Sequence, residues 1–260
     1  MSTIVHICEH DIPDLTMTPV KSAQRILDIF ELYAERGRPA TLSMIASALE
    51  VPKSSCLALI STLTSRGYLY ELRPQTGYYP TRRWLDKASA IAANDPLVAM
   101  VRPILNTLRD ELGQTIIFGK LSGPQVIYLD VAESHETLRY TAVAGQTKPL
   151  HGTASGKAAL GALPAASRKA LIAQLGFERL TPRTIQDADS LEAEIGRGVA
   201  RGFHVSLGEN VPDAAAVAVP VAVNREVYVL IAAGLISRLE PSLEMVGTHL
   251  RRASAEISTL

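Results

Sequence analysis

Cysteine is scarce in this sequence, and long apolar runs are absent from it. Cys8 and Cys56 are the only cysteines among 260 residues, too few for a disulfide framework or a cysteine-rich zinc site. No run of about 20 apolar residues is present, which argues against a membrane-spanning helix. The opening stretch MSTIVHICEHDIPDL also lacks the basic and apolar regions of a secretory signal. We therefore expect a cytoplasmic protein that has no membrane partner and no structural metal.

Patterns that mark common catalytic sites are missing as well. The six histidines are scattered, without an H-x-x-x-H or H-E-x-x-H pair, and no G-x-S-x-G elbow occurs. His151 and Ser155 could serve as base and nucleophile, but nothing in the sequence orients the imidazole. We expect no catalytic residue and no cofactor. A small hydrolase or transferase that works through these two residues is the enzymatic alternative.

The segment PLHGTASGKAAL has some features of a phosphate-binding loop but departs from that motif. It is one residue shorter than G-x-x-x-x-G-K, and Ala158 stands where Ser or Thr is required. A helix N-terminus with Thr153, Ser155 and free backbone N–H groups could instead bind a carboxylate or another small anion. Simple capping of the helix by Thr153 or Ser155 accounts for the same residues, so the sequence leaves both interpretations open.

Acidic residues are missing from the stretch VPKSSCLALISTLTSRG, which begins at Val51. Its apolar residues recur at helical spacing and predict one buried face. The opposite face holds small and mostly hydroxylated side chains. This composition suits a helix that approaches phosphates and base edges, because carboxylates there would repel the phosphates. A face that only meets water, or one that docks a partner protein, would also fit.

The residues around this stretch are basic, although the formal net charge of the chain is zero. Residues 18–83 carry nine Lys and Arg against five Asp and Glu, whereas residues 84–260 carry 17 against 18. A basic segment on a nearly neutral chain indicates a polyanion as partner.

The periodicity of the first eighty residues predicts three helices and a hairpin. We expect helices over 19–36 and 41–50 and a third within 51–67, with Thr41 or Ser43 as the N-cap of the second and Pro52 in the first turn of the third. The runs YLYEL and YYPT flank the turn RPQTG and predict a β-hairpin. This order is that of a winged helix-turn-helix, in which the third helix enters the major groove of DNA. The expected parts are a flexible extension over 1–17, the winged unit over 18–82 and a linker helix over 83–95.

The remaining residues, 96–260, mix helices with short strands and predict one α+β domain. The chain is thus expected to be a mixed α/β protein with an antiparallel sheet in its second part. We expect helices over 96–112, 153–163, 167–176, 189–202 and 241–260, and strands over 115–121, 125–132, 138–145, 203–208, 215–223 and 227–234.

Five stretches give the chain a clear resemblance to the IclR-type bacterial transcriptional regulators (the isocitrate lyase regulator family). They are KSAQRILDIFELYAERG, VPKSSCLALISTLTSRGYL, RPILNTLRDELGQTIIF, GQTKPLHGTASGKAAL and RGFHVSLGENVPDAAAVAVPV. The resemblance implies a winged helix-turn-helix, a linker helix and a GAF-like effector domain. It also implies dimers, often paired into tetramers, that bind palindromic operator DNA and respond to a small-molecule effector.

The resemblance also implies positions for the two binding sites. The effector pocket would be formed by Tyr140, Thr153, Ala154, Ser155, Gly156, Ser206, Ala216, Ala232 and Gly234. Contacts to DNA would come from Lys21, Ser22, Arg25, Lys53, Ser54, Ser55, Ala58, Ser61, Thr62, Arg66 and Arg73, with phosphate contacts from the basic members.

The sequence departs from the family pattern at two informative places. An Arg is usual in the third helix where Ala58 stands, so base contacts are expected to be fewer or differently placed. In the expected pocket, Ala216, Ala232 and Gly234 are apolar where some relatives have polar anchors. We therefore expect a pocket with few side-chain donors that favours an aromatic or partly apolar small acid.

Overall fold

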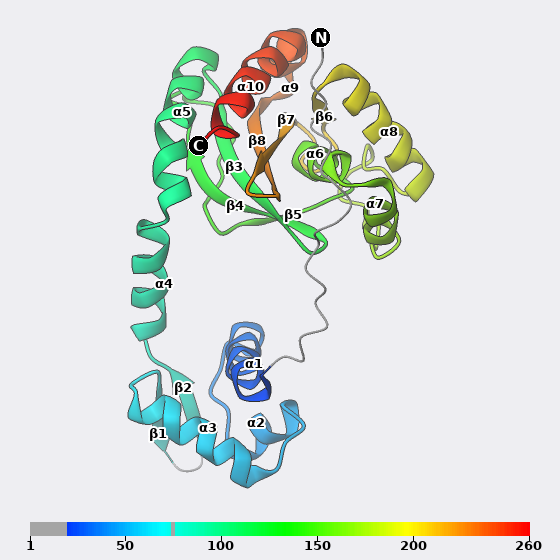
Figure 1. The fold of residues 1–260 in the computed structure, drawn as a ribbon. Coiled ribbons are helices and arrows are strands. Elements are labelled where there is room, and N and C mark those ends of the chain that lie inside the picture. Colours follow the sequence, from blue (N-terminus) through cyan, green and yellow to red (C-terminus); the bar gives the residue numbers. More distant parts are fainter. Residues whose placement is uncertain (1–19, 74–75) are drawn as a thin grey trace. The chain divides into compact units, whose positions relative to one another are not determined.

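A computed structural model describes residues 20–73 and 76–260, which form two compact units. Within the described residues, the first unit ends at Asp95 and the second begins at Pro96 (Figure 1). The extension expected over 1–17 lies outside the described residues. The side chain of Arg73, an expected phosphate contact, also lies outside them.

The first unit contains the three helices and the hairpin that the sequence predicts, followed by the expected linker helix. Its elements are α1 (Lys21–Arg36), α2 (Leu42–Ala48), α3 (Lys53–Ser65), β1 (Leu69–Arg73), β2 (Gly77–Pro80) and α4 (Arg83–Ala93). The strands β1 and β2 pair antiparallel and form the wing.

Local signals set the ends of these helices. Gly37 ends α1 in the left-handed conformation, with φ of 61°, and its N–H donates to the carbonyl of Tyr33. Thr41 caps α2 by accepting a hydrogen bond from the N–H of Met44. The buried side chains of α1, α2 and α3 meet in one core that includes Ile29, Ile45 and Ile60.

The second unit is a six-stranded antiparallel sheet with helices on both faces. The strand order is β5-β4-β3-β8-β7-β6. The strands are β3 (Thr115–Ser122), β4 (Gln125–Ala132), β5 (Thr147–Pro149), β6 (His204–Leu207), β7 (Ala214–Val223) and β8 (Glu226–Leu235). The helices are α5 (Pro96–Leu112), α6 (Ala154–Ala162), α7 (Ala165–Ile172), α8 (Ala188–Arg201), α9 (Ile236–Leu239), the 3-10 turn η1 (Glu240–Ser242) and α10 (Leu243–Ile257).

Two hydrophobic layers cover the faces of this sheet. The helices α5 and α10 pack on one face, and α6 and α8 pack on the other (Figure 1). Successive residues of β8 alternate between the layers, as strand geometry requires. Leu230 and Ala232 belong to the α5/α10 layer, whereas Ile231 and Ala233 belong to the α6 layer.

The structure corrects three details of the expected elements. Residues 138–145 do not form a strand, because the exposed segment gains only isolated hydrogen bonds, such as the one from Thr115 Oγ1 to the carbonyl of Tyr140 at 2.6 Å. The edge strand is instead the short β5. The helix expected over 167–176 begins earlier, at Ala165 behind Pro164, and ends earlier, at Ile172. The turns α9 and η1 were not expected from the sequence.

The described residues hold neither a helix that could span a membrane by itself nor a cluster of metal-binding side chains. No single helix there is long and apolar enough to cross a membrane, and α2 with α3 meets that test only as a pair bent by 111°. The same residues hold no group of three or more His, Cys, Asp or Glu side chains that could bind a metal ion.

Candidate DNA interface and effector pocket

The helix α3 separates its apolar and hydroxylated residues onto two faces, as its sequence predicts. Cys56, Ile60 and Leu63 are buried in the core of the first unit. On the opposite face, Ser54, Ala58, Ser61 and Thr62 are exposed, and Ser55 is half-buried. The expected base-reading residues therefore form one solvent-facing surface, and no acidic side chain lies on this helix.

Some hydroxyl groups on this surface already have partners within the helix. Thr62 Oγ1 donates to the carbonyl of Ala58 at 2.8 Å, and Ser65 Oγ donates to the carbonyl of Thr62 at 3.0 Å. These two hydroxyl protons are committed to the helix backbone. The side chains of Ser54 and Ser61 form no hydrogen bond to another described residue, so their hydroxyl groups are available to a ligand.

Basic side chains of the first unit are accessible near the ends of its helices. Lys21 and Ser22 lie exposed in the first turn of α1, Lys53 lies exposed at the start of α3, and Arg66 is its exposed C-cap. Arg25 is half-buried. None of these cations forms an ion pair with another described residue, so each remains able to contact a phosphate.

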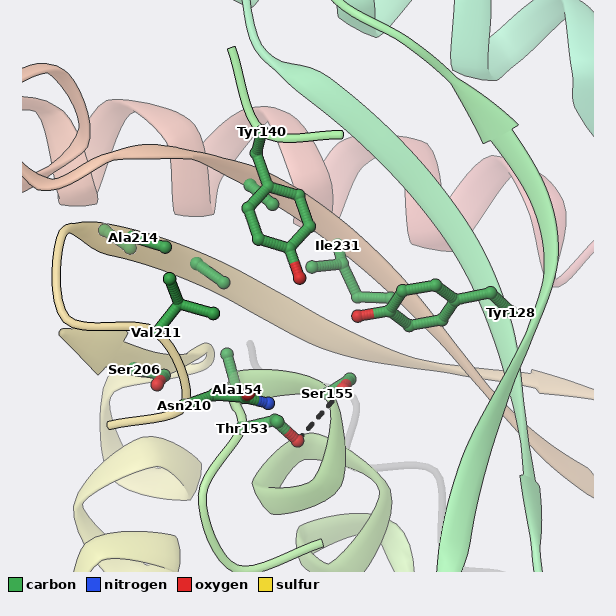
Figure 2. Close-up of a pocket in the computed structure, with 13 residues that line it drawn as sticks. Tyr128, Tyr140, Thr153, Ala154, Ser155, Ser206, Asn210, Val211, Ala214 and Ile231 are labelled. Carbon is green, nitrogen blue, oxygen red and sulfur yellow. Dashed lines mark hydrogen bonds between the residues drawn. The ribbon is translucent and has the colours of Figure 1, made fainter. Parts of the chain in front are cut away.

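A pocket lies in the second unit, between the N-terminus of α6 and the strands β7 and β8 (Figure 2). The cavity that its walls enclose has a volume of about 30 Å³. The walls therefore stand close together in this state. They comprise Tyr128, Tyr140, Thr153, Ala154, Ser155, Ser206, Asn210, Val211, Ala214, Ala215, Ala216, Ile231 and Ala233.

The first turn of α6 forms the polar end of the pocket. Thr153 Oγ1 accepts a hydrogen bond from the N–H of Gly156 at 3.0 Å and donates to the carbonyl of Pro149 at 2.7 Å. Ser155 Oγ donates to Thr153 Oγ1 at 3.1 Å (Figure 2). Thr153 is thus the N-cap of α6, as the capping interpretation predicts, and its side chain also lines the pocket. The positive end of the helix points into the same space.

Two tyrosines and one asparagine add polar groups from other elements. Figure 2 shows the hydroxyl groups of Tyr128 and Tyr140 directed into the pocket. Burial, more than any other cause, raises the pKa of Tyr128, so its phenol stays protonated and can donate. The side chain of Asn210 forms no hydrogen bond to another described residue. No Lys, Arg or His lines the pocket, so an anion there would meet neutral donors and the helix end.

Six of the nine expected effector positions line this pocket, and three do not. Tyr140, Thr153, Ala154, Ser155, Ser206 and Ala216 lie in its walls. Ala232 and Gly234 lie on the opposite face of β8, where Ala232 joins the α5/α10 layer and Gly234 faces Gln114. Gly156 packs against the backbone of Leu150. The neighbours of Ala232 and Gly234 on β8, Ile231 and Ala233, line the pocket instead.

This pocket also holds polar side chains beyond the expected ones. The wall made by β7 and β8 is apolar, as expected, but Tyr128 on β4 and Asn210 on the loop after β6 add polar groups that sequence reasoning missed. Tyr128 is one of the buried residues that alternate with partly exposed ones in QVIYLDVA, and its side chain is polar at one end, a signal that could have identified it. Asn210 and Val211 lie on a loop, for which the sequence offers no periodicity.

A buried ion pair joins two walls of the pocket. Lys157, fully buried on α6, donates from Nζ to the carbonyl of Val205 at 2.8 Å and to Glu209 Oε1 at 2.6 Å. Glu209 precedes Asn210 and Val211 in the loop that lines the pocket. Burial raises the pKa of Glu209, and the charge of Lys157 lowers it to a smaller extent. The ion pair thus ties this loop to α6.

His151 and Ser155, the two residues of the enzymatic alternative, contact other groups and not each other. His151 Nε2 lies 2.9 Å from the carbonyl oxygen of Glu178, and its ring packs against Phe177. Ser155 Oγ donates to Thr153. A hydrogen bond from the serine to the imidazole, which nucleophilic catalysis by this pair requires, is therefore not formed.

Two family models match this chain and together cover most of it. The model of the IclR helix-turn-helix domain matches residues 22–73, which span α1 to β1. The model of the bacterial transcriptional regulator IclR C-terminal domain matches residues 89–259, which include every wall of the pocket.

Curated relatives of this chain are named as transcriptional regulators. The probable transcriptional regulator SauR of Cupriavidus necator is 33% identical over 204 residues, which cover 78% of this chain and 81% of that protein. The transcriptional regulator BhcR of Paracoccus denitrificans is 29% identical over 202 residues, which cover 78% of this chain and 72% of the relative. Both are named as regulators and neither as an enzyme.

Solved structures share the fold. An IclR family transcriptional regulator from Brucella abortus superposes with a TM-score of 0.72 at 23% identity, and the match covers 96% of each chain. An IclR homologue from Microbacterium hydrocarbonoxydans, crystallised with 4-hydroxybenzoate, superposes with a TM-score of 0.68 at 19% identity, over 92% of this chain and 98% of that one. With both domain models matched, an acid-free helix on a winged unit and a pocket in the second domain, this chain belongs to the IclR family of bacterial transcriptional regulators.

Proposed function

We propose that this regulator binds palindromic operator DNA as a dimer through α3, and that a small organic acid in the pocket of the second unit controls this binding. The observation that carries the proposal is the exposed, acid-free face of α3, accompanied by Lys21, Lys53 and Arg66, which pair with no acid among the described residues. Two copies would place their α3 helices in half-sites about 34 Å apart. Pairing of dimers into tetramers is part of the same proposal.

The effector proposed for the pocket is an aromatic or partly apolar acid. The alanines of β7 and β8 together with Ile231 form a flat apolar wall, and the first turn of α6 faces it with hydroxyl groups and backbone N–H groups. A carboxylate would bind at the helix end, and a ring would lie against the alanines. The homologue crystallised with 4-hydroxybenzoate supports the capacity of this fold for such a ligand.

The narrowness of the pocket suggests how the effector acts. A ring-sized ligand needs more room than the present space offers, so its binding requires some of the walls to move apart, and we propose that the loop that carries Asn210 and Val211 is the wall that moves. A ligand that binds the opened state better shifts the population toward it. We propose that this shift alters the spacing of the two α3 helices in the dimer and so weakens or strengthens operator binding.

A selection experiment tests the main proposal. The full chain is mixed with genomic DNA fragments, bound fragments are recovered, and their retention is measured in a mobility-shift assay at increasing salt. Selective retention that falls steeply with salt supports operator binding. A protein-docking module would retain no fragment selectively, and this outcome would overturn the proposal.

Lys53→Ala is expected to weaken binding to all duplexes alike. The ammonium group lies at the exposed N-terminus of α3, where it would contact a phosphate and carry no sequence information. The slope of log affinity against log salt should become shallower by about one unit. Titrations at several salt concentrations measure this slope, with Lys87→Ala on α4 as the exposed control. A slope equal to that of the wild type would show that Lys53 touches no phosphate.

Ala216→Leu is expected to reduce the affinity for an aromatic acid by at least about 10-fold, because three added carbons would occupy the space beside the apolar wall. Calorimetry with 4-hydroxybenzoate and with glyoxylate measures the effect, and Ala222→Leu on the same strand is the control outside the pocket. Tight binding of glyoxylate alone would contradict the effector class. Equal binding of the aromatic acid by Ala216→Leu and the wild type would contradict the location.

A further inference from the structure

The body of α3 lacks every side chain that reads guanine or adenine by paired hydrogen bonds. Beyond Lys53 at its first position, the helix KSSCLALISTLTS contains no Arg, Lys, Asn or Gln. Arg and Lys pair with guanine in the major groove, and Asn and Gln pair with adenine. Sequence discrimination by the middle of this helix must therefore use hydroxyl groups or apolar contacts.

Leu57 is an exposed apolar side chain on this helix. Its side chain is not part of the core of the first unit, and 45% of its surface is accessible. Helical geometry places Leu57 one turn from Lys53 and one turn from Ser61, and Ala58 lies beside it on the exposed side. Leu57 and Ala58 thus form an apolar patch between residues that would contact the backbone and the base edges.

We infer that Leu57, together with Ala58, contacts the 5-methyl group of thymine in the major groove and so gives the operator a requirement for thymine at that position. This inference rests on the proposed role of α3 as the DNA-reading helix. The 5-methyl group is the apolar feature that thymine presents in the major groove. DNA is the occupant that the charges favour, since α3 carries no acid, and Lys53 and Arg66 near its two ends form no ion pair with a described residue.

The expected energy of the contact follows from the area that it removes from water. Burial of one methyl-sized group corresponds to about a 4-fold change in affinity. The paired hydrogen bonds by which Arg, Lys, Asn and Gln recognise bases are stronger than this contact. An operator that is bound mainly through hydroxyl and apolar contacts should therefore lose less affinity on a single base change than most operators do. Discrimination should be largest where the thymine methyl meets Leu57.

Replacing thymine by deoxyuridine tests the inference, because this change removes only the methyl group. Duplexes are first selected from a random pool with the full-length wild-type protein. Each thymine of the selected site is then replaced in turn. The wild type should bind about 4-fold more weakly when the critical thymine of a half-site is replaced. Leu57→Ala should bind the thymine-containing site more weakly than the wild type does. Replacing thymine by deoxyuridine should then lower the affinity of this variant almost no further.

Two control variants separate this contact from other effects. Leu57→Met keeps an apolar side chain of similar length and should retain most of the penalty for deoxyuridine. Lys53→Ala should bind every duplex more weakly yet retain the full penalty, because a phosphate contact does not sense the methyl group. Thermal unfolding of Leu57→Ala should match the wild type, since the side chain is half exposed.

The outcomes distinguish the inference from the function on which it rests. Equal binding of thymine and deoxyuridine at every position would overturn the inference, as would an undiminished penalty in Leu57→Ala. A selected operator without thymine in the half-site would also overturn it. Failure of the wild type to select any duplex would instead overturn the proposed DNA binding, and a partner protein that requires Leu57 would then be the alternative occupant.

Discussion

Lys157→Met should lower the free energy of unfolding of the second unit by about 3–5 kcal/mol, the largest effect that we expect from a single substitution. Lys157 is fully buried, and its Nζ is the cation that faces Glu209 at 2.6 Å. Methionine fills a similar volume but leaves the carboxylate buried without a counter-charge. Burial already raises the pKa of Glu209, and the loss of Lys157 should raise it further.

The pH dependence of this variant has a definite sign. A carboxyl group whose pKa is higher in the folded than in the unfolded chain destabilises the fold as the pH rises above the unfolded value. The difference in the free energy of unfolding between Lys157→Met and the wild type should therefore shrink as the pH falls from about 7 toward 5, because a protonated Glu209 carries no charge that a cation must balance. Urea unfolding at several pH values, followed by circular dichroism, measures this change.

Matched variants make the interpretation specific. The pair of Lys120 and Glu226, at 3.1 Å, is partly exposed at both side chains, so Lys120→Met should cost at most about 1 kcal/mol. The double variant Lys157→Met/Glu209→Leu removes both charges and should recover much of the lost stability. If Lys157→Met proves as stable as Lys120→Met at neutral pH, the buried pair does not hold the loop to α6.

Gly156→Ala should destabilise the second unit by about 1–3 kcal/mol, the second of the two largest effects. A Cβ at this position would overlap the Cα and the carbonyl oxygen of Leu150, which are backbone atoms and cannot rotate away. The helix α6 would have to shift, and Thr153 and Ser155 in the pocket would move with it. We therefore also expect a weaker affinity for the aromatic probe.

The control for this variant is Gly196→Ala on α8. A Cβ added at Gly196 would meet no atom within 4 Å, so alanine should stabilise this helix by up to about 1 kcal/mol, its ordinary advantage over glycine. Urea unfolding of both variants under identical conditions measures the opposite signs. Equal gains in stability would indicate that Gly156 is not a close-packing position.

The first unit could be predicted from the sequence almost completely. Its helices alternate apolar and polar residues with a period near 3.6, and Gly37, Thr41 and Pro52 mark their ends. The buried and exposed faces of α3 followed directly from that period. These features depend on residues close together in the chain, and neighbouring residues are what a sequence pattern reports.

The pocket could be predicted only in part. Thr153, Ser155 and their neighbours belong to one contiguous motif and were identified together. On β8 the expected positions, Ala232 and Gly234, are neighbours of the residues that line the pocket, and the run VYVLIAAG is apolar almost throughout. Both faces of this strand are covered by helices, so no alternation of polar and apolar residues indicates which face Ala232 or Ala233 occupies.

The sequence by itself therefore determined the order of the elements, the composition of the reading helix and the motif at the start of α6. Only the tertiary structure decided which residues meet at the pocket, that Glu209 pairs with Lys157 at 2.6 Å, and that Gly156 serves close packing. The physical reason is the number of residues that separate the contacting side chains along the chain. Periodicity and capping act within a few residues, whereas these contacts depend on strand register and on loops that bring distant residues together.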